Sequence, residues 1–126
     1  LLRNLVKKYN IKKRNILGHS DIAPNRKKDP GEKFPWEILA KKKLCDWHNL
    51  EENKIKKKRN FKIKLYEEKI FLKNLYRIGY PRVNGTNYNS KKLNLIKSFQ
   101  RKFRQSLING KIDQECLLIS KNLLKH

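Results

Sequence analysis

Apolar residues recur at intervals of three or four positions in several stretches of the sequence, which is the spacing of one face of an α-helix. The first such stretch covers residues 2–9 and ends at Asn10, with apolar residues at Leu2, Leu5, Val6 and Tyr9. Residues 14–18 predict a short buried strand instead. Residues 19–35 are rich in Pro, Asp, Asn and Gly, a composition typical of a loop.

A short helix is expected to follow this loop at Pro35, because the first turn of a helix leaves the N–H of its residues unbonded and proline has none. Its apolar residues are Trp36, Ile38, Leu39 and Ala40. Residues 44–60 are strongly charged and include four consecutive cations at 56–59. We interpret this segment as a basic, partly helical linker between a first unit, residues 1–43, and a second unit, residues 61–126.

Three further helical patterns predict that the second unit is a small all-α three-helix bundle. The first helix ends at Gly79, which can adopt a positive φ, and has one apolar face of Leu65, Leu72, Leu75 and Tyr76. The second is expected to begin at residues 89–90, where Asn or Ser can cap it, and to bury Leu93, Ile96, Phe99 and Phe103. After a turn at residues 109–110, Asp113 is expected to cap a third helix that buries Cys116, Ile119 and Leu123.

The formal net charge of +22, from 33 Lys and Arg against 11 Asp and Glu, would ordinarily indicate an anionic partner such as nucleic acid or a membrane surface. The cations are spread along the whole chain, however, whereas a nucleic-acid-binding protein concentrates them on one face. We therefore interpret most of them as solvated surface residues and expect no nucleic-acid partner. No stretch approaches the roughly 20 consecutive apolar residues of a transmembrane helix, so none is expected.

The sequence starts at Leu1 and contains no Met, and it has no segment with the pattern of a signal peptide. These features predict an incomplete product. Cys45 and Cys116 lie in different predicted units, and a disulfide between them stays open. We favour two small, semi-buried thiols.

The segment from His19 to Gly31 combines an imidazole, two carboxylates and three cations in a single loop. Neutral imidazole and carboxylate oxygens are zinc ligands, and a catalytic zinc site needs three protein ligands plus an open position for water. His19 and Asp29 could supply two of these. Spacing alone does not distinguish such a site from a surface pair of His and Asp.

A longer pattern surrounds this loop. It comprises Tyr9-Asn10-Ile11, the run from Gly18 to Pro24 (GHSDIAP), Arg26-Lys27, Asp29-Pro30-Gly31 and Phe34-Pro35-Trp36. The pattern resembles the signature of the amidase-2 family, which includes zinc-dependent N-acetylmuramoyl-L-alanine amidases and is similar in fold to peptidoglycan recognition proteins. The resemblance implies that residues 1–43 are the C-terminal part of an α/β amidase domain.

The resemblance also implies the roles of individual residues. His19 and Asp29 would be ligands of Zn²⁺, and Lys27 would be the catalytic lysine that faces the carbonyl oxygen as it becomes negative. Arg26 is a candidate for binding carboxylates of the stem peptide, with a solvated arginine as the equal alternative. Asp21 is expected to orient the loop or cap a turn. The implied reaction is hydrolysis of the amide between N-acetylmuramic acid and L-alanine in peptidoglycan or its fragments.

Two parts of the family's machinery have no counterpart in residues 1–18, namely a third ligand, which is a His on an early strand, and an acid/base Glu. His48 and His126 stand outside the motif and are expected to be exposed. We therefore expect that these 126 residues alone bind zinc poorly and are inactive.

The second unit resembles the three-helix peptidoglycan-binding domain that follows some cell-wall amidases. The residues that carry the resemblance are the run from Leu75 to Tyr80, the pairs Phe99-Gln100 and Phe103-Arg104, and the run from Gly110 to Asp113. It implies binding to peptidoglycan or muropeptides and a place in the bacterial cell envelope, in the periplasm or at the outer membrane. We expect a monomer. The alternatives are a non-catalytic peptidoglycan-binding remnant and, more remotely, a basic helical nucleic-acid binder.

Overall fold

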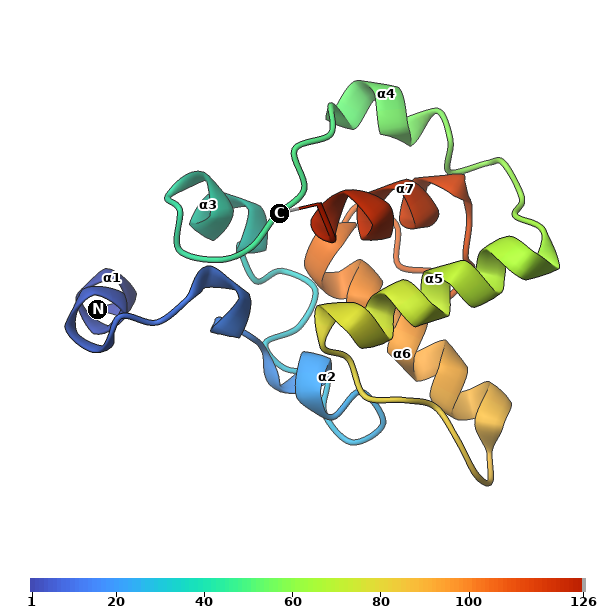
Figure 1. Ribbon diagram of the computed structural model, residues 1–126, viewed down its shortest axis with the longest axis horizontal. Coiled ribbons are helices and arrows are strands. Elements are labelled where there is room, and N and C mark those ends of the chain that lie inside the picture. The colour runs from blue at the N-terminus through green and yellow to red at the C-terminus, as the bar shows by residue number, and fades with distance from the viewer. Residues whose placement is uncertain (126) are drawn as a thin grey trace.

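The computed structural model describes residues 1–125, and all regular elements in this range are helical (Figure 1). In chain order they are α1 Leu2–Tyr9, η1 Lys13–Asn15 (a 3₁₀-helix), α2 His19–Ile22, α3 Trp36–Lys41, α4 Glu52–Lys56, α5 Leu65–Ile78, α6 Tyr88–Phe103 and α7 Gln114–Leu123. None of these helices is both long and apolar enough to traverse a bilayer.

The predicted strand at residues 14–18 is wrong. Residues Lys13–Asn15 form the single turn η1, and Leu17 is 47% exposed. The described chain contains no β-strand for this segment to pair with, only an isolated bridge between Lys62 and Asp113. An unpaired strand leaves its backbone groups without partners, so two adjacent apolar residues do not suffice to make one. The α/β class expected for the first unit is therefore not confirmed in residues 1–125.

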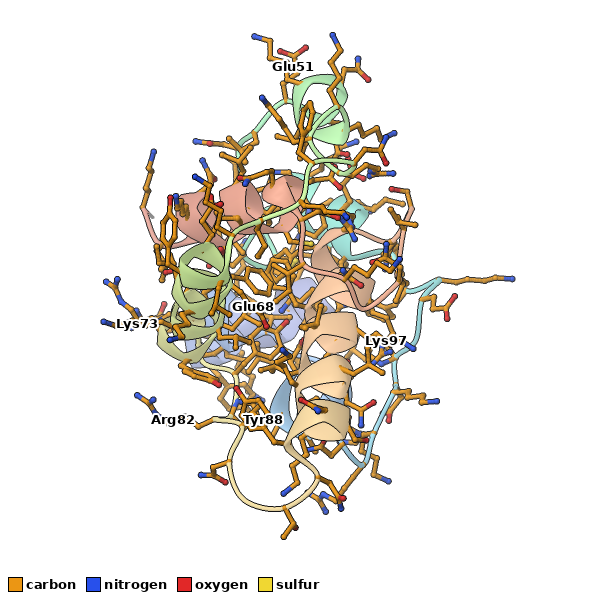
Figure 2. All side chains as sticks on the ribbon, turned by 90° about the vertical axis from the view of Figure 1, so that its right-hand side faces the viewer. Glu51, Glu68, Lys73, Arg82, Tyr88 and Lys97 are labelled. Atoms are coloured by element: carbon orange, nitrogen blue, oxygen red, sulfur yellow. The ribbon has the colours of Figure 1, made fainter. Side chains whose placement is uncertain are left out.

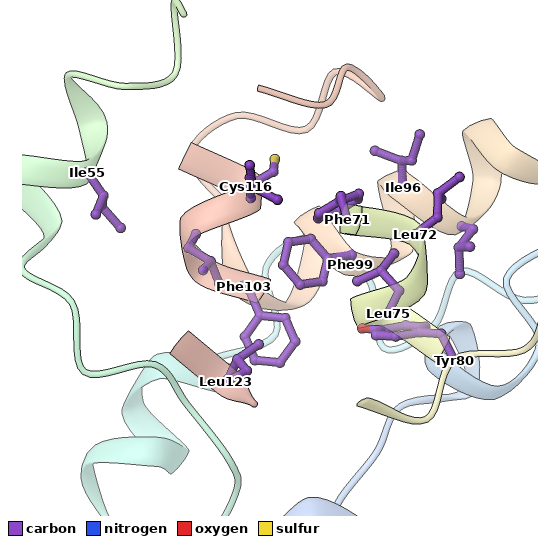
Figure 3. Packing of buried hydrophobic residues seen from close by; sticks show 13 residues of the cluster. Ile55, Phe71, Leu72, Leu75, Tyr80, Ile96, Phe99, Phe103, Cys116 and Leu123 are labelled. Carbon is purple, nitrogen blue, oxygen red and sulfur yellow. The ribbon is translucent and has the colours of Figure 1, made fainter. Parts of the chain in front are cut away.

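The core lies among α5, α6 and α7, as predicted for the second unit. Phe99 occupies its centre and is fully buried, with its ring 5.2 Å from that of Phe71 and 5.1 Å from that of Phe103, measured between ring centroids (Figure 3). Aliphatic side chains from all three helices surround these rings: Leu72, Leu75, Leu95, Ile96, Leu117, Ile119 and Leu123.

Two residues of the predicted apolar faces do not reach this core. Leu65, 70% exposed, is the first residue of α5 and lies beyond the region that the other helices cover. Leu93, 41% exposed, lies in the first half of α6 and packs over the backbone of Gly110. Helical spacing identifies a face, but only the crossing of the helices decides how far along that face burial extends.

The ends of the helices follow local backbone chemistry. Gly79 ends α5 with φ 128°, and the Asp113 carboxylate accepts a hydrogen bond of 3.0 Å from the Cys116 backbone N–H at the start of α7, so both predictions are confirmed. The predicted start of α6 is one or two residues late. The helix begins at Tyr88 after Asn87, which adopts the left-handed conformation that Asn tolerates.

The segment of residues 44–60 packs against the bundle through several side chains. Ile55 of α4 joins the hydrophobic core, and the Arg59 guanidinium forms an ion pair with the buried Glu115 at 3.1 Å. Asn49 exchanges two hydrogen bonds with Asn122 of α7. These contacts fix the segment against α7, while its role as a linker between two units stays a prediction.

His48 is buried, so the expectation of an exposed side chain is wrong; His126 lies outside the described residues. The His48 ring stacks on Trp47, with centroids 5.3 Å apart, and burial lowers its pKa below the ordinary value of 6.5. Cys45 and Cys116 are free and buried, which confirms two structural thiols, and burial raises the pKa of Cys116 to about 11.

We expect His48 to make stability depend on pH. A His whose pKa is lowered in the folded state takes up its proton more readily when unfolded, so its contribution is present above pH 6.5 and is lost as the pH falls below that value. The free energy of unfolding, measured in urea between pH 7.5 and pH 5, should therefore decline, and His48→Gln should flatten the decline. His19→Gln is the control at an exposed position, and an unchanged slope in His48→Gln would contradict the assignment.

The position of Phe99 predicts a large effect of truncation. Phe99→Ala should lower the free energy of unfolding by about 3–5 kcal/mol because it leaves a cavity at the centre of the core. Leu93→Ala, on the same helix and half-exposed, should cost below about 1 kcal/mol. Urea unfolding followed by circular dichroism measures the free energy of unfolding of both variants. If both lose a similar amount of free energy, Phe99 is not at the centre of the core.

Candidate functional site

The loop that carries the candidate chemistry begins with a helical turn. Gly18 precedes α2, and its backbone N–H donates a hydrogen bond of 3.0 Å to Asp21 Oδ2. This confirms the expectation that Asp21 caps a turn. The Ser20 backbone N–H also donates to the Asp29 carbonyl oxygen at 3.0 Å, which closes the loop and brings its two ends together.

His19 and Asp29, the two predicted zinc ligands, lie side by side as a result. His19 Nδ1 is 2.6 Å from Asp29 Oδ2, and the side chains are 67% and 58% exposed. Desolvation raises the pKa of the Asp29 carboxyl, but the hydrogen bond with His19 and the charges of His19 and Lys27 outweigh it, so the pKa lies below its ordinary value. The carboxylate is thus ionised at neutral pH, the form in which it binds a metal.

An apolar hollow of about 370 Å³ adjoins the pair. Its lining includes His19, Asp29 and Pro30 together with six apolar side chains: Leu2, Ile16, Leu17, Phe34, Trp36 and Leu39. A concave apolar surface with a few polar groups at its rim is the usual form of a small-molecule site. The hollow can therefore hold an apolar part of a ligand against the His19–Asp29 pair.

The His19–Asp29 pair has the types of donor atom that zinc prefers, but two ligands are fewer than a catalytic zinc site needs. Imidazole nitrogen and carboxylate oxygen are both zinc donors, but a catalytic site uses three protein ligands. Within residues 1–125, no third His, Cys, Asp or Glu joins His19 and Asp29 in a cluster that could hold a metal. The described residues provide two donors of a three-donor set.

Lys27 and Arg26 lie on the same loop and are exposed. Their backbone N–H groups both donate to the carbonyl oxygen of Ala23, at 2.9 and 3.0 Å, which places the two residues in the turn that follows α2. Lys27 is near enough to Asp29 for its charge to lower the pKa of that carboxyl. A mobile ammonium beside the His19–Asp29 pair can stabilise a developing negative charge there.

A buried ion pair beneath the loop was not foreseen from the sequence. Lys102 Nζ of α6 lies 3.5 Å from Asp21 Oδ2, and both side chains are 5% exposed. The Tyr80 hydroxyl donates a hydrogen bond of 2.7 Å to the other oxygen of Asp21. Burial, together with the adjacent Asp21 charge, raises the pKa of Tyr80 well above its ordinary value, so the hydroxyl keeps its proton and remains a donor.

The same ammonium group also contacts the flanks of the motif. Lys102 Nζ donates to the Ile16 carbonyl oxygen at 3.2 Å and lies 4.4 Å from the centroid of the Trp36 ring, a cation–π contact. Three other side chains of the bundle bond to the loop: Ser98 to the Ser20 carbonyl, Gln105 to the Phe34 carbonyl and Asn94 to the Asn25 side chain. Three residues on one face of α6, Asn94, Ser98 and Lys102, thus hold the loop together with Gln105, which follows the end of the helix.

The chain is similar to known cell-wall amidases. It is 32% identical over 125 residues to the N-acetylmuramoyl-L-alanine amidase AmiD of Escherichia coli, an alignment that covers 99% of this chain and 45% of that enzyme. A shorter match, 53% identical over 34 residues, joins 27% of the chain to 18% of the 1,6-anhydro-N-acetylmuramyl-L-alanine amidase AmpD of Enterobacter cloacae. No protein-family model matches the chain.

Solved structures show the same likeness in fold. The structure of E. coli AmiD, in complex with the substrate anhydro-N-acetylmuramic acid-L-Ala-D-γ-Glu-L-Lys, matches 98% of this chain with a TM-score of 0.84 and 29% identity. AmpDh3 from Pseudomonas aeruginosa, in complex with anhydromuramic pentapeptide, matches 98% with a TM-score of 0.78 and 25% identity. The chain spans just under half the length of AmiD and of AmpDh3, 48% and 49% respectively.

The Asp21–Lys102 pair predicts a strong energetic coupling between the loop and α6. Asp21→Asn should lower the free energy of unfolding by about 3 kcal/mol because it leaves the Lys102 ammonium buried without a counter-charge. Adding Lys102→Met should recover more than half of this loss. The control is Glu37→Gln, which breaks the exposed pair with Lys41 and should cost below about 1 kcal/mol. Urea unfolding of the parent chain, Asp21→Asn, Lys102→Met, the double variant and Glu37→Gln tests the coupling, and additive losses in the two single variants would disprove it.

Proposed function

We propose that the chain acts in an N-acetylmuramoyl-L-alanine amidase, which hydrolyses the amide bond between N-acetylmuramic acid and L-alanine in peptidoglycan or its fragments. The proposal is carried by the 2.6 Å approach of His19 Nδ1 and Asp29 Oδ2 on a loop whose surrounding fold matches AmiD with a TM-score of 0.84. AmiD is bound to anhydro-N-acetylmuramic acid-L-Ala-D-γ-Glu-L-Lys in its matching complex, and AmpDh3 is bound to anhydromuramic pentapeptide. The same class of substrate is proposed for this protein.

His19 and Asp29 would hold Zn²⁺ together with a third protein ligand. Bound there, the metal would supply Lewis-acid polarisation of the scissile carbonyl and would make a coordinated water more acidic. The exposed ammonium of Lys27 stabilises the oxygen that becomes negative when the amide is attacked. The guanidinium of Arg26 is available at the same turn for a carboxylate of the stem peptide.

The helical bundle of residues 61–125 would bind peptidoglycan and keep the reacting loop close to its substrate. Such tethering raises the effective concentration of scissile bonds without any new contact at the reacting atoms. The hydrogen bonds from α6 and from Gln105, which follows it, support this arrangement, because they join the bundle directly to the loop and its flanks. We place the protein in the cell envelope, in the periplasm or at the outer membrane, as a monomer.

A chimaera tests the proposal. The part of E. coli AmiD that this chain does not match is joined to the chain, and zinc-loaded protein is incubated with anhydro-N-acetylmuramic acid-L-Ala-D-γ-Glu-L-Lys. Release of the tripeptide, followed by liquid chromatography and mass spectrometry, is the expected result. Lys27→Ala should reduce kcat by about 10²–10³-fold, the loss seen when one group that stabilises an oxyanion is removed. Asp29→Asn should abolish bound zinc and turnover together.

The matched control is Lys12→Ala, which removes an exposed lysine that lies outside the motif. Its turnover should equal that of the unmodified chimaera. A chimaera that binds zinc and sediments with sacculi yet releases no peptide would instead identify a non-catalytic peptidoglycan-binding protein. Equal turnover in Lys27→Ala and Lys12→Ala would remove the catalytic role from Lys27.

A further inference from the structure

Arg101 of α6 is buried without an ion-pair partner among the described residues. It is 8% exposed, and its buried Nε has no hydrogen-bond acceptor within residues 1–125. Two nearby cations are also buried, but each has an ion-pair partner. Lys102, the next residue of α6, pairs with Asp21, and Arg104, at the end of the helix, pairs with Asp113 and Glu115. No ion pair recorded for the described chain includes Arg101. Burial of a charged group is unfavourable unless an anion compensates for it, so the exception requires an explanation.

The side chain of Arg101 lines a groove between α6 and the loop of residues 24–33. The groove has a volume of about 520 Å³ and is lined by four cations, Lys28, Lys33, Lys97 and Arg101, against one carboxylate, Glu32. Figure 2 shows Lys97 on the side of α6 that faces this loop. The groove is thus strongly positive, and Arg101 supplies its buried donor.

We propose that this groove is a binding site for a carboxylate of the peptide stem of the substrate. An arginine guanidinium is planar, remains charged and bonds carboxylate oxygens in pairs, which suits it to this role. In a partly dehydrated groove such charge-assisted hydrogen bonds are stronger than on an open surface. The lysines at the rim raise the local concentration of anionic ligand and accelerate its association.

The position of the groove indicates which molecule brings the carboxylate. Pro30 lines both this groove and the apolar hollow beside His19 and Asp29, so the two adjoin each other at this residue. A muropeptide whose scissile amide lies beside His19 and Asp29 can extend its peptide, with its free carboxylates, past Pro30 toward Arg101. This assignment of the ligand rests on the proposed function, whereas the anionic character of the ligand rests on Arg101 and the lysines of the groove.

Titration calorimetry on the full chain tests the site. The probes are the tripeptide L-Ala-D-γ-Glu-L-Lys, its fully amidated form and inorganic phosphate. We expect the carboxylate form to bind and the amidated form to bind at least about tenfold more weakly, since one charge-assisted hydrogen bond contributes about that factor. Arg101→Gln should weaken binding of the carboxylate form by at least about tenfold, and Lys97→Gln by a smaller factor. Lys73→Gln, on the exposed side of α5, should leave binding unchanged.

The free protein provides a second readout. Because Arg101 has no internal partner, Arg101→Gln should leave the thermal midpoint of the unliganded chain unchanged or raise it, and a large fall would overturn the site in favour of a structural role. Equal affinity for the amidated and carboxylate peptides, or Arg101-dependent binding of phosphate alone, would overturn the peptide assignment. His19→Asn should retain peptide binding at the groove. Binding that persists there while the chimaera releases no peptide would separate this inference from the proposed reaction.

Discussion

The buried ion pair between Asp21 and Lys102 is the constraint on which the candidate site depends. Asp21 lies in the short turn α2, directly after Ser20 and two residues after His19, while Lys102 lies near the end of the longest helix of the bundle. A carboxylate and an ammonium that are both 5% exposed cannot separate without leaving a charge unsolvated. The pair therefore fixes the motif on α6, and the hydroxyl of Tyr80 fixes it on the end of α5.

The free-energy contributions of the exposed and the buried ion pairs show which of them keeps His19 beside Asp29. Their contact is largely exposed, and exposed ion pairs contribute about 0–1 kcal/mol. Loss of one partner of a buried pair costs about 3–5 kcal/mol. The exposed contact is thus a consequence of the loop conformation and does not maintain it. The backbone bond from Ser20 to Asp29 and the Asp21–Lys102 pair beneath it set the geometry, and both exposed side chains remain free to bind a ligand.

The parts of this structure that the sequence predicts are those governed by local rules. Helical spacing and the turn residues Gly79 and Asp113 identify the three bundle helices, and the motif resemblance identifies His19 and Asp29 as neighbours. The predictions that are wrong concern features that depend on tertiary contacts. A strand at residues 14–18 needs a pairing partner, and the burial of His48 needs the return of residues 44–60 onto α7. Lys102 carries no local signal, because in a chain with 33 cations nothing in the sequence separates a paired, buried lysine from a solvated one.

The cations that make up the high net charge have different roles, depending on whether they are exposed or buried. Most cations are solvated, as composition suggests, and contribute little to the fold. Three cations at positions 101, 102 and 104 are instead buried at the junction of α6 with the loop and with α7. Two of them are neutralised inside the chain by Asp21, Asp113 and Glu115. The C-terminal end of α6 therefore combines charges that stabilise the fold with one charge, on Arg101, that an external anion can neutralise. This links binding to the element that positions His19 and Asp29.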